Sequence, residues 1–141
     1  MEYICDAPNG RTWFRLMTEA EAAAESAEMR HAVEKYFRRE REKAEQRYQP
    51  LTTVYIEQDI GKAAHISRTM PLFLTLRDED GKPLVTAMLP PAGRDDPDFA
   101  CIIVGAANAD PYPQHADAIK ALERHFDIAL DRADCYPYRR G

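Results

Sequence analysis

Histidine side chains can support catalysis or metal binding, and the sequence contains four of them: His31, His65, His115 and His125. No two of them lie one helical turn apart, the spacing by which a helix presents two metal ligands on one face. We therefore expect no metal site. His115 lies four residues before Ile119, near the apolar face of a predicted helix, which favours a partly buried structural histidine over a catalytic one.

The three cysteines are odd in number, far apart in the chain and never arranged as Cys-x-x-Cys, and they are Cys5, Cys101 and Cys135. This pattern indicates reduced thiols rather than a disulfide framework or a zinc site. Cys101 falls inside the apolar run 99–105, which is typical of a small core residue. The N-terminal residues show neither the basic nor the apolar region of a secretory signal, so we expect a cytoplasmic location.

Carboxylates gather at two places in the sequence. Asp127 and Asp131 are four residues apart in a predicted helix, and Asp134 follows them. Because they alternate with apolar residues, they are typical of a solvated helix surface. The acidic loop 95–98 lacks the spacing and the closing Glu of a calcium-binding loop. Neither group predicts a cation site.

Motifs for nucleophilic catalysis and for nucleotide cofactors are missing. The chain has only six glycines, and Gly105 follows a predicted strand without the further glycines or the Lys-Ser/Thr pair of a phosphate-binding loop. Ser26 and Ser67 are the only serines, and neither lies in a Gly-x-Ser-x-Gly motif. We expect no cofactor.

The segment 30–47 is the only long basic region, with seven Lys and Arg residues against four Glu residues. Its mixture of aromatic and basic side chains could stack on bases and neutralise phosphates. However, Glu34 can pair with Arg38 one helical turn later, and the whole chain carries a formal charge of −5. We therefore do not expect a nucleic-acid partner.

Two other readings of the same segment are a solvated helix surface whose charges pair with one another, and a protein-interaction surface. Tyr and Arg are favoured at protein interfaces. The candidate residues for this surface are Tyr36, Phe37, Arg38 and Arg41.

A long helix is predicted to carry this surface. Thr18 and Glu21 form a capping box, the pattern in which two side chains satisfy the backbone donors at a helix start. From Glu19 to about Tyr48 the chain contains no Gly or Pro, and Pro50 then ends the helix. About 30 residues extend to about 45 Å, whereas a compact domain of this size is about 35–40 Å across. We therefore expect the second half, where 38–43 contains no apolar residue, to overhang or bind a partner.

Two hairpins are predicted from alternating apolar segments. The first joins Tyr3–Cys5 to Thr12–Met17 through Pro8-Asn9-Gly10, a strong turn signal. The second joins Leu72–Leu76 to Leu84–Leu89 through a polar loop that contains a glycine.

The other segments complete the predicted fold. A strand is predicted at Leu51–Glu57, and 62–69 fits either a helix or a strand. The apolar segment Phe99–Gly105 is predicted to be a central strand. A second helix is predicted from Gln114 to Ala133, with its apolar face on the sheet.

This order of elements predicts one α+β domain over residues 1–141. We expect an antiparallel sheet of about five to six strands, with a long N-terminal helix and a C-terminal helix packed on one face. Hydrophobic residues make up 45% and charged residues 30%, the usual balance of a folded domain. No run approaches the roughly 18–20 apolar residues of a membrane helix, so we expect no membrane interaction.

Two functional hypotheses stay open. The first is a non-enzymatic interaction module that forms a homodimer, or binds an unidentified protein, through the long helix. The alternative is a small-molecule or enzymatic site in a pocket between the sheet and the helices. The candidate residues for that pocket are Cys101, Tyr112 and His115.

Overall fold

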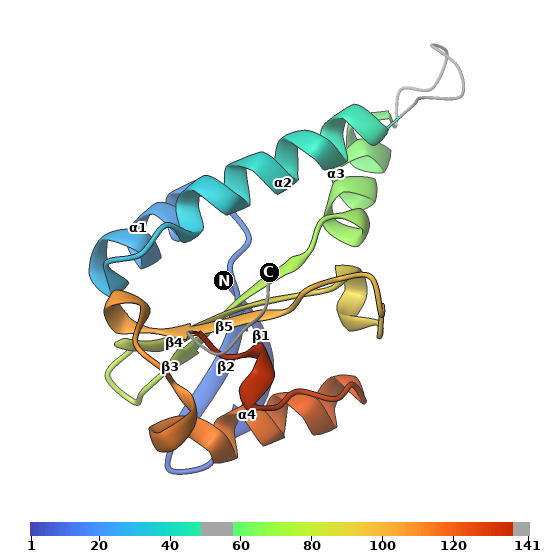
Figure 1. Ribbon diagram of the computed structural model, residues 1–141. Coiled ribbons are helices and arrows are strands. Elements are labelled where there is room, and N and C mark those ends of the chain that lie inside the picture. Colours follow the sequence, from blue (N-terminus) through green and yellow to red (C-terminus); the bar gives the residue numbers. More distant parts are fainter. Residues whose placement is uncertain (49–57, 137–141) are drawn as a thin grey trace.

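The computed structural model describes residues 1–48 and 58–136, and contains one antiparallel sheet flanked by helices (Figure 1). The strands cross the sheet in chain order, each antiparallel to its neighbours. They are β1 Glu2–Ala7, β2 Arg11–Arg15, β3 Leu72–Arg77, β4 Pro83–Leu89 and β5 Ile102–Gly105. The helices are α1 Glu19–Met29, α2 Val33–Arg47, α3 Gln58–Thr69 and α4 Tyr112–Phe126, and the short 3-10 helices are η1 Pro91–Gly93, η2 Ala106–Asn108 and η3 Arg132–Asp134. The α+β class with an antiparallel sheet is confirmed.

Both predicted hairpins are present. Asn9 and Gly10 have φ values of 66° and 74°, left-handed conformations that both residue types tolerate, in the three-residue loop between the paired Ala7 and Arg11. In the loop between β3 and β4, Gly81 has a φ of 81°. The ambiguous segment 62–69 is helical, as the larger part of α3. The strand predicted at 51–57 lies outside the described residues.

The single long helix predicted from Glu19 to Tyr48 is wrong, although its start is right. Thr18 and Glu21 form the predicted capping box. The helix ends at Arg30, whose φ of 56° is left-handed, and α2 then folds back along α1. Arg38 Nε accordingly donates to Glu19 Oε1 at 2.6 Å. This reversal brings the apolar face of α2, including the buried Phe37, onto the sheet, where a straight helix would have left it in solvent.

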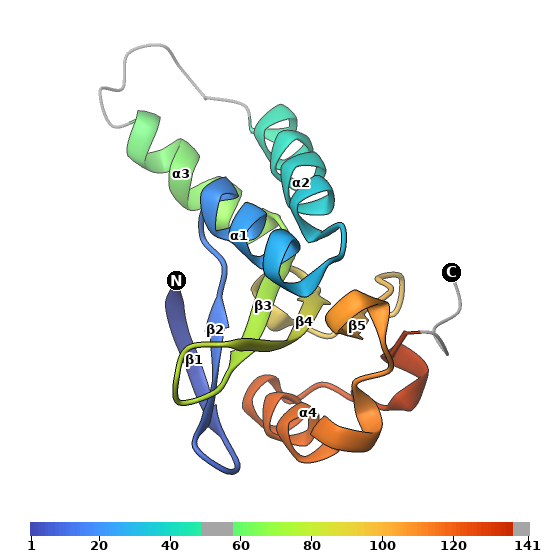
Figure 2. The ribbon, with the colours of Figure 1, turned by 90° about the vertical axis from the view of Figure 1, so that its left-hand side faces the viewer.

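Helices cover both faces of the sheet, which corrects the expectation that they share one face. Helices α1, α2 and α3 lie on one side and α4 on the other (Figure 2). The alternation along β3 explains this arrangement, because Leu74 and Leu76 join the core with α4 while Phe73 packs against Phe37 of α2. A strand buried on both faces reads as a continuous apolar run.

The position of β5 and the end of α4 also differ from the predictions. Strand β5 lies at the edge of the sheet rather than in its centre. Its apolar composition suits the edge because the C-terminal segment pairs with it. Ile103 forms a parallel β-bridge with Cys135, and Tyr136 N–H donates to the Ile103 carbonyl at 2.9 Å. Helix α4 ends at Phe126, because Asp127 has a left-handed φ of 55°, and Leu130 reaches the core from the loop beyond.

A buried ion pair joins α1 to the sheet. Glu25 is 0% exposed, and its Oε1 accepts hydrogen bonds from Arg77 Nη2 at 2.7 Å and Thr75 Oγ1 at 3.0 Å. Its Oε2 accepts from Thr86 Oγ1 at 2.6 Å. Strands β3 and β4 therefore supply all the described hydrogen-bond partners of this fully buried carboxylate, which sets where α1 lies on the sheet.

We expect Glu25→Ala to lower the free energy of unfolding by about 3 kcal/mol, because it leaves Arg77 charged and largely buried without a counter-ion. Glu25→Gln should cost less, since an amide oxygen can still accept from Thr75. Urea unfolding followed by circular dichroism measures both. Glu28→Ala, at an exposed position of the same helix, is the control, and a loss at Glu25 no larger than at Glu28 would contradict the role of the ion pair.

Candidate functional site

A cavity of about 410 Å³ lies between the end of β2, α2 and α3. We call it the α2–α3 cavity. Its volume falls in the lower part of the roughly 300–1,000 Å³ range of small-molecule sites. Its apolar walls include Leu16, Phe37, Ile66 and Met70, and its polar lining consists of Arg15, Arg41, Glu45, Lys62 and Ser67.

Helix periodicity brings these side chains to one place. On α2, Phe37, Arg41 and Glu45 recur every four residues and so share one face. Lys62 in α3 and Met70, directly after α3, are eight residues apart, about 12 Å at 1.5 Å per residue. Phe37 packs on the sheet and Met70 leads directly into β3, so the apolar end of the cavity lies at the sheet and Glu45 and Lys62 lie toward its mouth.

Arg15 lies at the sheet end of the cavity as the last residue of β2, and is only 9% exposed. Its Nη1 donates to Ser67 Oγ at 3.2 Å and its Nη2 donates to the Ser67 carbonyl at 2.8 Å. That carbonyl would normally accept the N–H of the residue four positions later, but this residue is Pro71, which has none. Arg15 thus caps the C-terminal turn of α3.

The charge of Arg15 is only partly compensated. Among the described residues, no carboxylate oxygen lies within 4.0 Å of its guanidinium. Burial lowers the pKa of Arg15, an effect that Glu2 partly opposes, and the guanidinium stays protonated. The C-terminus of α3 contributes a partial negative charge of about one half. The remaining positive charge faces the cavity.

The mouth of the cavity contains one ion pair and one further cation. Arg41 and Glu45, one helical turn apart on α2, form an ion pair in which Arg41 Nε lies 3.4 Å from Glu45 Oε1. Lys62 is exposed and forms no ion pair with a described residue. The lining therefore carries a net positive charge, which suits an anion.

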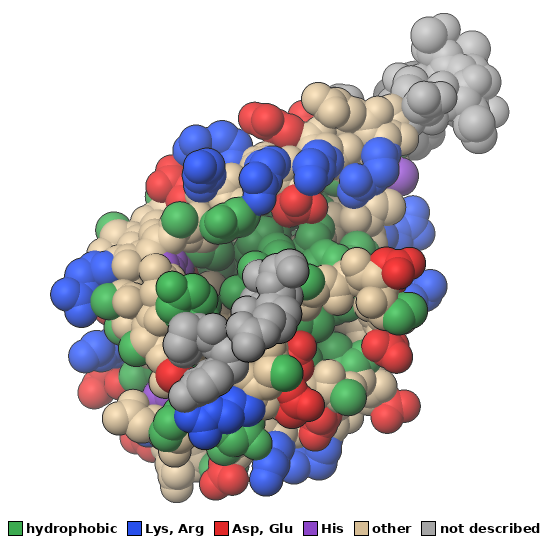
Figure 3. Space-filling view, viewed as in Figure 1, with side chains coloured by type: hydrophobic (Ala, Val, Ile, Leu, Met, Phe, Trp, Pro, Cys, Tyr) green, Lys and Arg blue, Asp and Glu red, His purple; other side chains and the backbone are tan. Residues whose placement is uncertain are grey.

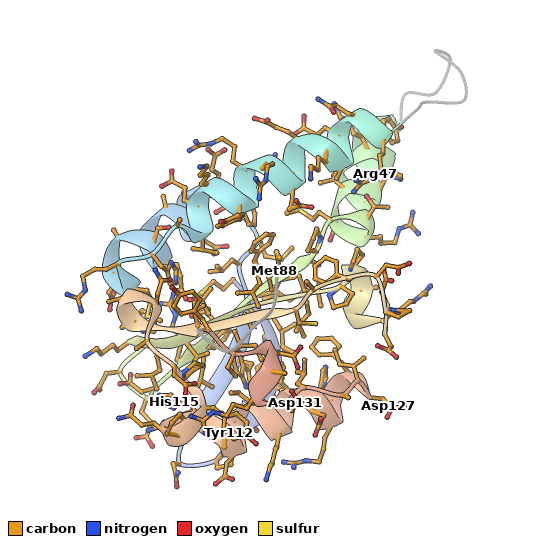
Figure 4. All side chains as sticks on the ribbon, viewed as in Figure 1. Arg47, Met88, Tyr112, His115, Asp127 and Asp131 are labelled. Atoms are coloured by element: carbon orange, nitrogen blue, oxygen red, sulfur yellow. The ribbon has the colours of Figure 1, made fainter. Side chains whose placement is uncertain are left out.

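A second cavity of about 270 Å³ opens on the same face of the sheet, between the α1–α2 turn, β4 and β5. Figure 3 shows hydrophobic side chains lining a hollow beneath a row of Lys and Arg side chains along α2, and Met88 lies in this hollow (Figure 4). Most of its lining is apolar, as at Val33, Ile102 and Val104.

The polar groups at the back of this second cavity already have partners. Thr86 donates its hydroxyl proton to Glu25, so His31 Nε2 must donate to Thr86 Oγ1, at 2.8 Å. His31 Nδ1 then accepts from Val33 N–H at 3.4 Å, which describes a neutral imidazole. Burial lowers the pKa of His31, although the Glu25 carboxylate opposes the shift.

The residues predicted for a pocket lie elsewhere. Tyr112 and His115 are on α4, on the opposite side of the sheet from α2 (Figure 4), and Cys101 packs against the core on that side. Arg11 Nη1 lies 3.0 Å from His115 Nδ1, and burial together with the Arg11 charge lowers the pKa of His115. Neither cavity described above is lined by these residues, and a functional role for them stays a prediction.

The structure separates the four residues predicted for an interaction surface. Phe37 is 2% exposed in the core, whereas Tyr36 is 39% exposed with the Arg39 guanidinium 4.8 Å above its ring. Arg38 forms ion pairs within the α1–α2 pair. Arg41 lines the α2–α3 cavity.

Thiol and metal chemistry find no support in the described residues. Burial, aided by nearby carboxylates, raises the pKa of Cys135 to about 12, and burial also raises the pKa of Cys5. Within residues 1–48 and 58–136, no three His, Cys, Asp or Glu side chains gather as metal ligands. Asp127 ends α4 and Asp131 caps η3, so they do not share a helix face.

No helix of the described residues combines the length and the apolar character needed to cross a membrane. No family model, curated protein or solved structure matches this chain. Its function must be inferred from the site itself.

Sequence reasoning missed the centre of the site, Arg15 and Ser67. One local signal was available, because Arg15 is a single cation inside the apolar segment Trp13–Met17. A second was Pro71, which deprives the preceding helix of a backbone donor. Neither signal says that the two residues meet.

We expect the protein to lose stability as the pH falls below about 6.5. Burial lowers the pKa of both His31 and His115, so the unfolded chain binds more protons in this range and the free energy of unfolding decreases. Urea unfolding at about pH 7.5 and about pH 5.5 measures the change. In the double variant His31→Asn/His115→Asn the difference should shrink, and an unchanged difference would contradict this origin.

Proposed function

We propose that the protein is a non-enzymatic binding domain whose ligand is a small organic anion in the α2–α3 cavity. The observation that carries this proposal is Arg15, a nine-tenths buried cation in the cavity lining, whose guanidinium has no described carboxylate oxygen within 4.0 Å. Burying an unpaired charge costs several kcal/mol. An anion in the cavity would offset that cost.

The geometry of Arg15 supports anion binding. Two of its five N–H groups donate to Ser67, and the planar guanidinium can offer the others to carboxylate or phosphate oxygens. Binding is favoured over catalysis because the Ser67 hydroxyl is already bonded to Arg15 and no histidine lines the cavity in the described part of the chain. The proposal corresponds to the pocket between sheet and helices that the sequence left as an alternative.

The test is a titration with sodium formate followed by amide chemical shifts. Shifts should concentrate in residues 15–17 and 62–67, and should disappear in Arg15→Met, because the probe loses its guanidinium partner. The amide spectrum also reports whether the variant is folded. Arg39→Met, on the exposed side of α2, is the matched control and should bind like the wild type. Shifts spread along the outer face of α2, or no shifts, would contradict the proposal.

Self-association through α2 is a second proposal, supported by the exposed Tyr36 beneath Arg39. Tyr and Arg are typical anchors of protein interfaces. The overhang that first suggested it is removed by the reversal at Arg30. A cytoplasmic location and binding to another protein stay predictions.

If α2 mediates a homodimer, sedimentation velocity at micromolar concentration should show a dimer that Tyr36→Ala converts to a monomer, because the substitution removes the exposed aromatic anchor. Tyr3→Ala, at another exposed tyrosine on β1, is the control and should leave the dimer intact. A wild-type monomer at the same concentration would exclude this proposal.

A further inference from the structure

We propose that the anion bound in the α2–α3 cavity is a monocarboxylic acid with a single apolar tail. This inference rests on the proposed function and adds the chemical class of the ligand. The carboxylate lies against Arg15 at the sheet end, and the tail packs on the apolar walls beside it.

The charge balance of the cavity selects a monoanion. Among the described lining residues Arg15 is the only cation that is nine-tenths buried, and Arg41 is already paired with Glu45. A single carboxylate neutralises Arg15, whereas a phosphate dianion would place a second, uncompensated negative charge in a poorly solvated site. Lys62 is exposed at the mouth, where its charge is screened by water.

The apolar walls select a ligand with a tail. Leu16, Phe37 and Met70 are each at most 5% exposed, and all three line the cavity. The lining runs along about two turns of each helix, so a chain of several methylene groups fits beside Ile66 and Ala63. Acetate or formate would leave these walls uncovered.

Calorimetric titrations with sodium acetate, hexanoate and octanoate test the tail. Affinity should rise by about threefold to fourfold per methylene group, which corresponds to about 0.8 kcal/mol for each buried CH₂, with one site per chain. Titrations with 1-hexanol and hexyl phosphate test the head group. Both should bind at least about tenfold more weakly than hexanoate, because 1-hexanol carries no charge and hexyl phosphate carries a second negative charge that Arg15 does not neutralise.

Two pairs of variants place the site. Ala63→Phe should fill the cavity and abolish octanoate binding, while Ala64→Phe, at the next exposed position of α3, does not line the cavity and should bind normally. Arg15→Met should abolish binding, and Arg15→Lys should weaken it while keeping the charge. Because Arg15 also caps α3, circular dichroism must show that these variants are folded, and Ala63→Phe decides the question if they are not.

The outcomes distinguish a failure of this inference from a failure of the proposed function. Chain-length-dependent binding that is lost in Ala63→Phe supports both. Formate binding at Arg15 without an increase from acetate to octanoate leaves the anion site standing and overturns the tail. Tighter binding of hexyl phosphate overturns the monocarboxylate, and equal binding of 1-hexanol overturns the role of the charge. If no probe binds the folded wild type, both proposals fail.

Discussion

The buried ion pair between Glu25 and Arg77 is the interaction on which the arrangement of the helices depends. A carboxylate with no exposed surface must find all its partners in the protein, and Thr75, Thr86 and Arg77 provide them from two adjacent strands. Only one position of α1 on the sheet satisfies all these bonds. An apolar contact alone would tolerate sliding, whereas these directed bonds do not.

The position of α1 decides where the next helices lie. Because α1 ends in the left-handed Arg30, α2 returns beside it, and the Arg38–Glu19 ion pair joins the two helices. Helix α3 then descends to β3, where Arg15 caps its last turn. Arg47, at the end of α2 (Figure 4), donates from Nη2 to the Thr69 carbonyl at 3.1 Å. The α2–α3 cavity is the space that these constraints leave between the two helices and the end of β2.

Arg15 therefore both caps α3 and lines the α2–α3 cavity. As a cap it stabilises the C-terminus of α3, where a cation is favoured. As a buried cation with no described carboxylate oxygen within 4.0 Å, it also carries a desolvation cost, of the kind that functional sites often retain at the expense of stability. A ligand that removes this cost would bind to the folded protein alone and raise its stability by mass action.

The sequence by itself determined the features that depend on neighbouring residues: the Asn9-Gly10 turn, the Thr18–Glu21 cap, and the strands β3 and β4. It did not determine the break at Arg30, because no Gly or Pro marks it and the reason for it is burial of Phe37 on a distant sheet. Nor did it determine the site. Arg15 and Ser67 are 52 residues apart and meet because β2 pairs with β3, which α3 immediately precedes. Local patterns report local conformation, whereas the side chains that form a cavity are brought together only by tertiary packing.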